Sequence, residues 1–448
     1  MEKFLANIQM NVIMALCFTA IFIVVIRKHR FFKDSGLSFQ ILIGIFSLKL
    51  LSAIALHLLY SIYYTERSEA DIFKYFDDAL VLFESFKDSP TIFFKLFFSV
   101  DIQNAALTPY YDAMNFWERK IDYGIFNDNR TIIRLNAILM FVSWGNIFVH
   151  HCIASFVSLI ACICLYKVFR YYFPTQNILI AIGIFLIPSS LFWTSALLKE
   201  TVVMLGLGLT MYGLHRNLHK SQMHAISILL LGIVVLSTVK LYVVAAFVPA
   251  IAAFILSRKY DTIPPLVVFV GIFIVSIAAV VVNHILGFVP FLETLASKRN
   301  DFIMDAAYYA HAQSYIEIGM IRPTLAAFVS ETPIALLRAF QLPIIFYIQK
   351  PLELMPALEN LVCIVLIICM AFWFKKPDKK QRAIIWFSLF FSIGLLWFVG
   401  VSTPVVGAIV RYKMPLLPFL YTSLALCIDW KKITDLLLRR KTYGSSII

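Results

Sequence analysis

The sequence predicts an all-α membrane protein, a polytopic bundle of about ten to thirteen transmembrane helices. Hydrophobic residues make up 61% of its 448 residues, and charged residues make up only 15%. The mean hydropathy is +0.84, which is too apolar for an ordinary soluble domain. Apolar runs of about 20 residues, enough to cross a hydrocarbon core as helix, recur along the chain. A transmembrane barrel would instead show short segments of alternating hydropathy.

Eleven segments are apolar enough to be expected as spans. They cover residues 8–26, 39–60, 147–168, 177–197, 200–214, 224–239, 241–257, 265–287, 353–374, 383–401 and 414–430. The segments at 200–214 and 224–257 are short or fused, so the expected number of spans stays between about ten and thirteen. Three interrupted apolar segments fit helices that lie along the membrane surface: 91–99, 132–143 and 333–348.

Lysine and arginine gather in one set of connections between these spans. The clusters are RKHR at 27–30, KVFR at 167–170, HRNLHK at 215–220, SRKY at 257–260, KKPDKKQR at 375–382 and the basic residues after 430. The positive-inside rule places them in the cytoplasm. The two long connections, 62–146 and 288–352, are then exterior loops that carry the interfacial helices. We expect residues 1–448 to form a single integral membrane domain.

The net charge of +13 follows from this topology and from contact with membrane lipids, which include anionic ones. Nucleic acid is therefore not an expected partner. The chain also lacks a Walker loop, a dinucleotide-binding glycine fingerprint, HExxH and GxSxG. Nucleotide hydrolysis, hydride transfer, zinc proteolysis and serine hydrolysis consequently lack their usual residues.

The first exterior loop holds the most acidic stretch of the chain, DIFKYFDDALVLFESFKD at 71–88. Its apolar residues recur at helical spacing: Ile72, Tyr75, Phe76, Leu80, Phe83 and Phe86. This pattern predicts an amphipathic helix whose acids, Asp71, Asp78 and Glu84, point away from the apolar face.

Two interpretations of these acids are open. The stretch is either the solvated face of an interfacial helix or a functional site at the membrane surface, where ionisable groups are costly. In the second case Asp71, Asp77 or Asp78 is a general base. Alternatively, Asp77 and Asp78 bind a divalent cation, Mg²⁺ or Mn²⁺, because adjacent carboxylates favour charge compensation.

The layout of the chain resembles the GT-C superfamily of membrane glycosyltransferases. The shared features are a long exterior first loop with an acidic motif, interfacial helices behind it, about ten or more spans and further polar loops on the same side. The segments IPSSLFWTSALLKE and VRYKMPLLPFL also resemble bacterial envelope proteins of the EpsG or polysaccharide-polymerase kind. The DE or HxDE signature common in GT-C enzymes is missing, and Asp77 and Asp78 stand where it is expected.

The resemblance implies a GT-C-like fold and a glycosyltransferase in a bacterial inner membrane. The enzyme would take a sugar from a polyprenyl-phosphate-linked donor and pass it to an envelope polysaccharide or glycolipid acceptor. Its active face would be periplasmic, and an aspartate of the first loop would be the base. The alternatives are an O-antigen-type polymerase, which joins lipid-linked repeats, and a lipid or glycan flippase, which would need charged residues at mid-membrane.

Lys199 and Glu200 lie on a short exterior turn between two expected spans. They either cap helices and pair with each other, or Lys199 binds the carrier phosphate while Glu200 orients the acceptor hydroxyl or the lysine. Lys240, between two short spans, is a further candidate for the phosphate.

Arg411 and Lys413 precede the last expected span on the exterior side, where basic residues are uncommon. They either extend to lipid headgroups or bind phosphate, for which arginine offers a planar charged fork. Arg338 in the second exterior loop is another candidate for the phosphate.

Overall fold

The computed structural model describes residues 2–63, 67, 70–118, 127–219, 222–260, 262–309, 312, 314–348 and 350–444. Within these ranges the protein is helical, and its extended pairing is limited to two isolated bridges, Tyr315 with Val405 and Phe374 with Ile428. The prediction of an all-α fold is confirmed.

Seven helices among the described residues are long and apolar enough to cross a membrane. They are α1 (Glu2–Lys28), α3 (Phe39–Tyr63), α8 (Ile147–Tyr172), α13 (Leu241–Lys259), α14 (Pro265–Leu286), α17 (Pro351–Phe372) and α18 (Lys379–Ser402). Each coincides with one of the expected spans. The protein is therefore a multi-pass membrane protein.

The other four expected spans contain shorter or more polar helices. Segment 177–197 is divided into α9 (Asn177–Phe185) and α10 (Pro188–Trp193), because proline removes a backbone donor and disfavours helix in the preceding residue. The remaining three contain α11 (Lys199–His219), α12 (Met223–Ser237) and α20 (Leu417–Leu426).

The long connections are also largely helical. The first holds α4 (Asp71–Asp88), α5 (Pro90–Phe98), α6 (Thr108–Ala113) and α7 (Asp128–Ser143), and the second holds α15 (Phe291–Met304) and α16 (Leu325–Gln341). Two of the segments expected to lie along the membrane surface, 91–99 and 132–143, fall almost entirely within α5 and α7, whereas α16 contains only residues 333–341 of the third segment, 333–348. The other helices are α2 (Arg30–Lys33), α19 (Val406–Lys413) and α21 (Trp430–Gly444).

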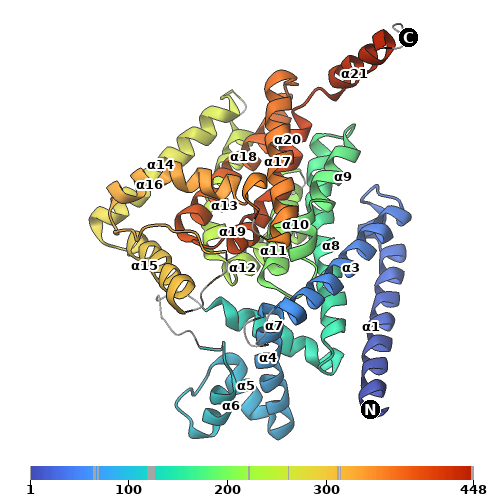
Figure 1. Cartoon of the computed structure of the whole chain (residues 1–448), viewed down its shortest axis with the longest axis vertical. Coiled ribbons are helices and arrows are strands. Elements are labelled where there is room, and N and C mark those ends of the chain that lie inside the picture. Colours follow the sequence, from blue (N-terminus) through green and yellow to red (C-terminus); the bar gives the residue numbers. More distant parts are fainter. Residues whose placement is uncertain are drawn as a thin grey trace. The chain divides into compact units, whose positions relative to one another are not determined.

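The chain forms two compact units. Unit 1 comprises Met1–Val168 and Leu191–Leu241, and unit 2 comprises Phe169–Ser190 and Tyr242–Ile448. In unit 1, α4 and α7 pack side by side, as Figure 1 shows. In unit 2, α16 packs on α18, and α20 packs on α9.

Helices α11 and α12 of unit 1 approach each other at the level of the backbone. A Cβ atom on Gly213 would lie 2.5 Å from the amide nitrogen of Leu229, and one on Gly232 would lie 2.5 Å from that of Thr210. Small residues permit such close packing between membrane helices. The pair therefore places the beginning of α11 near the end of α12.

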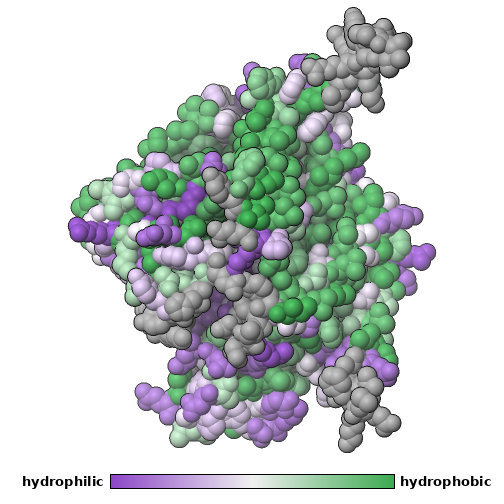
Figure 2. All heavy atoms as spheres, in the orientation of Figure 1, coloured by the Kyte–Doolittle hydropathy of each residue, from purple (hydrophilic) through white to green (hydrophobic). Residues whose placement is uncertain are grey.

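Unit 2 has an aromatic core and an apolar outer surface. Phe387 and Phe391 of α18 pack edge-on against Phe247 and Phe419. The outer face of α17 exposes a row of apolar side chains: Leu354, Leu358, Leu361, Val362, Val365 and Ile368. Figure 2 shows this apolar surface over α17 in green. An outer face of this kind suits contact with lipid.

Candidate functional site

Helix α4 carries the three candidate acids. Its apolar spacing predicted the helix correctly, and the structure places both ends within the predicted acidic stretch. The buried face consists of Ile72, Phe73, Tyr75, Phe76, Asp78, Ala79, Leu82, Phe83 and Ser85. Asp78 is only 1% exposed, so the expectation that it points away from the apolar face is wrong.

Asp78 lies on the buried face because it binds the backbone of a distant segment. Its two carboxylate oxygens accept hydrogen bonds from the amides of Asn115, at 2.9 Å, and Phe116, at 2.8 Å. Burial raises the pKa of Asp78, and the backbone hydrogen bonds oppose the increase only in part. Asp78 consequently fastens the segment that follows α6 to α4.

Asp77 lies in a different environment from its neighbour. Its side chain is 37% exposed and forms a bidentate ion pair with Arg67, with N–O distances of 2.7 and 2.8 Å. The Arg67 guanidinium also lies 4.2 Å from the centroid of the Phe73 ring. The carboxylates of Asp77 and Asp78, predicted to bind a divalent cation together, thus have separate protein partners.

Asp71 begins α4 and pairs with Lys74 one turn later. Lys74 Nζ lies 4.8 Å from the centroid of the Phe116 ring and 5.4 Å from that of Tyr75. The aromatic faces favour the ammonium group in this partly buried position. Asp71 is therefore held beside a fixed positive charge at the first turn of the helix.

Lys199 begins α11 and binds residues at the beginning of α7. Its Nζ donates to Asp128 Oδ2 at 2.8 Å and to Asn129 Oδ1 at 2.7 Å. Tyr75 joins this group, because its hydroxyl donates to Asn129 Oδ1 at 3.3 Å. Burial lowers the pKa of Lys199, whereas the charges of Asp128 and Asp71 oppose that decrease.

Among the described residues of unit 1, Glu200 and Lys240 form the most buried ion pair, with 2.8 Å between Nζ and Oε1. Their side chains are 0% and 5% exposed. Glu200 lies in the first turn of α11, and Lys240 follows the end of α12. The ion pairs of the Lys199–Glu200 turn thus connect it to Asp128 and Lys240, which are distant in sequence.

These ion pairs form one group, which we call the charged cluster: Asp71, Lys74, Asp128, Lys199, Glu200 and Lys240. None of the six side chains is more than 23% exposed. Three carboxylates balance three ammonium groups, so the formal charge of the group is zero. Partly buried charges are tolerated only when they are paired in this way.

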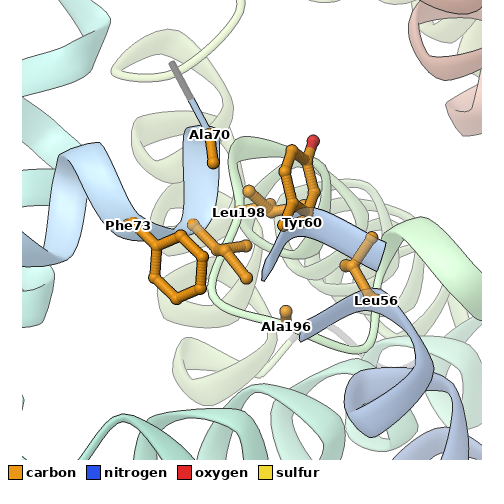
Figure 3. Close-up of a cluster of buried hydrophobic side chains, with 7 residues drawn as sticks. Leu56, Tyr60, Ala70, Phe73, Ala196 and Leu198 are labelled. Carbon is orange, nitrogen blue, oxygen red and sulfur yellow. The ribbon is translucent and has the colours of Figure 1, made fainter. Parts of the chain in front are cut away.

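A cluster of buried apolar residues supports the charged cluster (Figure 3). It combines Leu56 and Tyr60 of α3 with Ala70 and Phe73 around the start of α4 and with Leu198, which precedes α11. Since Ala70 directly precedes Asp71, and Leu198 directly precedes Lys199, this packing fixes the backbone at both charged positions. The apolar contacts therefore set the spacing of the acid and the lysine.

The structure brings together four of the nine predicted site residues: Asp71, Lys199, Glu200 and Lys240. Lys74 and Asp128 belong to the same group but were not predicted. The spacing of three residues between Asp71 and Lys74 signals a helical ion pair. No local signal identifies Asp128, because its partner lies 71 residues away.

The other basic candidates, Arg338, Arg411 and Lys413, lie in unit 2. Lys413 Nζ donates to the carbonyls of Leu342, at 2.8 Å, and Ala339, at 3.3 Å, and to Asn360 Oδ1 at 2.9 Å. All three ammonium donors are thus used inside the protein. Burial lowers the pKa of Lys413 to about 8.

Arg338 shares a carboxylate with another arginine. It pairs with Glu331, which also accepts from Arg299 Nη1 at 2.9 Å. Burial works against ionisation of Glu331, but the hydrogen bonds and charges of Arg338 and Arg299 hold its pKa below the ordinary value. Arg411 is half-buried in α19.

The chemistry available in the charged cluster is proton transfer and anion binding. Its carboxylates are able to accept a proton, and its ammonium groups are able to stabilise a phosphate. Among the residues that the structure describes, no group of three or more histidine, cysteine, aspartate or glutamate side chains is placed to hold a metal ion. No protein-family model, curated protein or solved structure matches this chain.

Proposed function

We propose that the protein is a glycosyltransferase of a bacterial inner membrane. It transfers a sugar from a polyprenyl-phosphate-linked donor to an envelope polysaccharide or glycolipid acceptor at the exterior face. The observation that carries the proposal is the charged cluster, in which a partly buried aspartate lies in one group with three lysines. The seven apolar helices support a substrate that reaches the site through the membrane.

Asp71 is the proposed base because it alone of the three candidate acids of α4 belongs to the charged cluster that contains Lys199. Asp77 is exposed and bound on both oxygens by Arg67. Both carboxylate oxygens of Asp78 accept hydrogen bonds from backbone amides. Asp71 is partly buried and pairs with Lys74 one turn along the same helix.

In the proposed reaction Asp71 accepts the proton of the acceptor hydroxyl, and the hydroxyl oxygen forms a bond to the anomeric carbon. The bond from that carbon to the phosphate oxygen breaks, and its electron pair stays on the departing polyprenyl phosphate. Lys199 and Lys74 stabilise the charge that develops on this phosphate. Glu200 is fully buried, so its role is to hold Lys240 and the start of α11 in place.

The test is complementation of a host strain that lacks the protein, followed by mass spectrometry of its glycolipids. Wild type should restore a glycolipid that carries one sugar more than its precursor, whereas Asp71→Asn should not. Asp77→Asn is the matched control, because it makes the same chemical change in the same helix at an exposed ion pair. Normal glycolipids with Asp71→Asn, at wild-type protein levels, would contradict the proposal.

The same measurement separates the alternative functions. If the protein were an O-antigen-type polymerase, its loss would change the length distribution of a glycan ladder and leave the single repeat intact. If the protein were a flippase, its loss would leave every sugar in place, and the lipid-linked product would stay on the cytoplasmic face. Loss of one sugar of defined mass supports the glycosyltransferase.

A further inference from the structure

Helix α17 carries a glutamate inside a membrane-spanning segment. Glu359 lies eight residues after the start of this 22-residue helix, which is about 12 Å along the axis at the rise of an α-helix. It is only 6% exposed and belongs to the inner face of α17, whereas the neighbouring Leu358 is 44% exposed. An acidic group at this depth is costly to keep charged, and such groups are typical of proton and ion sites.

The carboxyl group of Glu359 binds at a break between two helices. Helix α9 ends at Phe185, and α10 begins at Pro188. The amide of Ser189, in the first turn of α10, donates a hydrogen bond to Glu359 Oε1. Amides in a first helical turn have no acceptor within their own helix. Glu359 therefore supplies an acceptor that the interrupted helix needs, and it joins α10 to α17.

Contacts along the backbone hold Glu359 at this depth. The hydroxyl of Tyr421 in α20 donates to the Glu359 carbonyl at 2.7 Å. The side-chain amide of the next residue, Asn360, donates to the carbonyls of Gln341, at 3.0 Å, and Pro343, at 2.9 Å. A glutamate side chain is too short to reach the membrane surface from about 12 Å, and extension to the headgroups is a property of the longer lysine and arginine. The carboxyl group thus stays among protein atoms.

No cation contacts this carboxyl group within the described part of the chain, where Glu359 forms no ion pair. The ionisable side chains around it are Cys363 in the next turn of α17, Tyr421 in α20 and Lys413 in α19. Thiols and phenols are ordinarily neutral at neutral pH. The positive charge of Lys413 favours an ionised Glu359 from a distance, but its three ammonium donors bind other groups, as described above.

An ionised carboxylate in this position would be poorly compensated. A buried charge is tolerated when it has a close partner of opposite charge and enough hydrogen bonds, and Glu359 lacks the partner. The Ser189 hydroxyl lies within hydrogen-bonding reach of the same carboxyl group and has no other partner among the described residues. A neutral carboxyl group satisfies both groups of Ser189, since it accepts through one oxygen and donates through the other.

We propose that Glu359 is a proton-binding site within the membrane and that it is uncharged in the folded protein at neutral pH. Its carbonyl oxygen accepts from the Ser189 amide, and its O–H donates to Ser189 Oγ. Loss of the proton leaves a buried charge at the break between α9 and α10, which favours a conformation in which water reaches the break. The proton therefore controls the attachment of α10 to α17.

This site is independent of the proposed transferase, since Ser189 and Glu359 belong to unit 2 and the charged cluster belongs to unit 1. A proton that binds within a span couples a change of conformation to the proton concentration beside the membrane. The protonation state of Glu359 is measurable without glycosyl transfer, so failure of this proposal would leave the proposed function intact.

Infrared spectroscopy of the full-length protein in dodecyl maltoside, a detergent without carbonyl groups, tests the protonation state at neutral pH. A protonated carboxyl group has a carbonyl stretching band that is separate from the bands of ionised carboxylates and backbone amides, and the band shifts in heavy water. The difference between wild type and Glu359→Gln should contain this band. Glu353→Gln, in the first turn of the same helix, is the matched control, and its difference spectrum should lack the band. Absence of the band from the Glu359→Gln difference would overturn the proposal.

Thermal unfolding in the same detergent tests the role of the proton at the break. Glutamine reproduces the neutral acid, because its carbonyl oxygen accepts and its NH₂ group donates. Glu359→Gln should therefore unfold at the same temperature as wild type, whereas Glu359→Leu leaves the Ser189 amide without its acceptor and should unfold a few degrees lower. A loss of stability in Glu359→Gln as large as that in Glu359→Leu would show that the folded protein needs the ionised acid.

Discussion

Lys199 Nζ lies 2.8 Å from Asp128 Oδ2, although 71 residues separate the two in the chain. This contact joins the start of α11 to the start of α7 in the middle of the charged cluster. Because burial lowers the pKa of Lys199 and the charge of Asp128 opposes the decrease, Asp128 helps to keep the lysine protonated.

Asp128→Asn should therefore lower the pKa of Lys199 further. If protonated Lys199 binds the carrier phosphate, the alkaline limb of the pH–activity profile moves to lower pH in this variant. Transfer to acceptor by purified enzyme, measured between pH 6 and about pH 10, provides the test. Asp77→Asn is the control and should keep the wild-type profile. Superimposable profiles for Asp128→Asn and wild type would rule out Lys199 as the titrating group.

Asp78→Ala should destabilise the protein far more than Asp77→Ala. Loss of Asp78 removes the acceptor from the partly buried amides of Asn115 and Phe116, at a cost of about 0.5–1.5 kcal/mol for each hydrogen bond. Loss of Asp77 breaks an exposed pair that is worth about 0–1 kcal/mol. Thermal unfolding in detergent measures the difference. Similar melting temperatures for the two variants would show that the backbone contacts of Asp78 contribute little.

Lys413 should make the stability of the protein depend on pH at the alkaline end. Its pKa is about 8 in the folded protein, below the ordinary value of 10.5. Between these values the unfolded state binds more protons than the folded state, so the contribution of Lys413 to stability increases as the pH rises through this range. Lys413→Met removes this contribution. The difference in the free energy of unfolding between wild type and Lys413→Met should therefore change between pH 7.5 and pH 10 in favour of wild type. An equal difference at the two pH values would contradict the prediction.

Gly213→Ala should disrupt the packing of α11 on α12. A Cβ atom there would lie 2.5 Å from the nitrogen and 2.8 Å from the Cα of Leu229, neither of which is able to move without shifting the helix. Gly44→Ala is the matched control, because nothing lies within 4 Å of its Cβ position. It should leave stability unchanged or raise it by about 0.5–1 kcal/mol through helix propensity. Equal melting temperatures for both variants would contradict the close packing.

Local patterns in the sequence predicted much of the fold. Hydropathy located the seven long apolar helices, and apolar spacing located α4. These features depend on neighbouring residues, which is why the sequence alone is sufficient to predict them.

The geometry of the site depended on contacts that no local pattern encodes. The aspartates at positions 77 and 78 look equivalent in sequence, yet Asp77 binds Arg67 at the surface and Asp78 binds the backbone of residues 115–116. Likewise, Lys199 and Glu200 are adjacent but have partners in two distant segments, Asp128 in α7 and Lys240 after the end of α12. Only the folded chain distinguishes these residues.

The equal number of cations and anions in the charged cluster has a consequence for how a substrate arrives. A group without net charge produces little long-range attraction, and at physiological ionic strength its field is screened within about 8 Å. The rate of encounter should therefore depend weakly on salt and strongly on lateral diffusion of the lipid-linked donor within the bilayer. Under the proposed function, the fluidity of the membrane, more than the composition of the surrounding buffer, would set the rate at which the donor is captured.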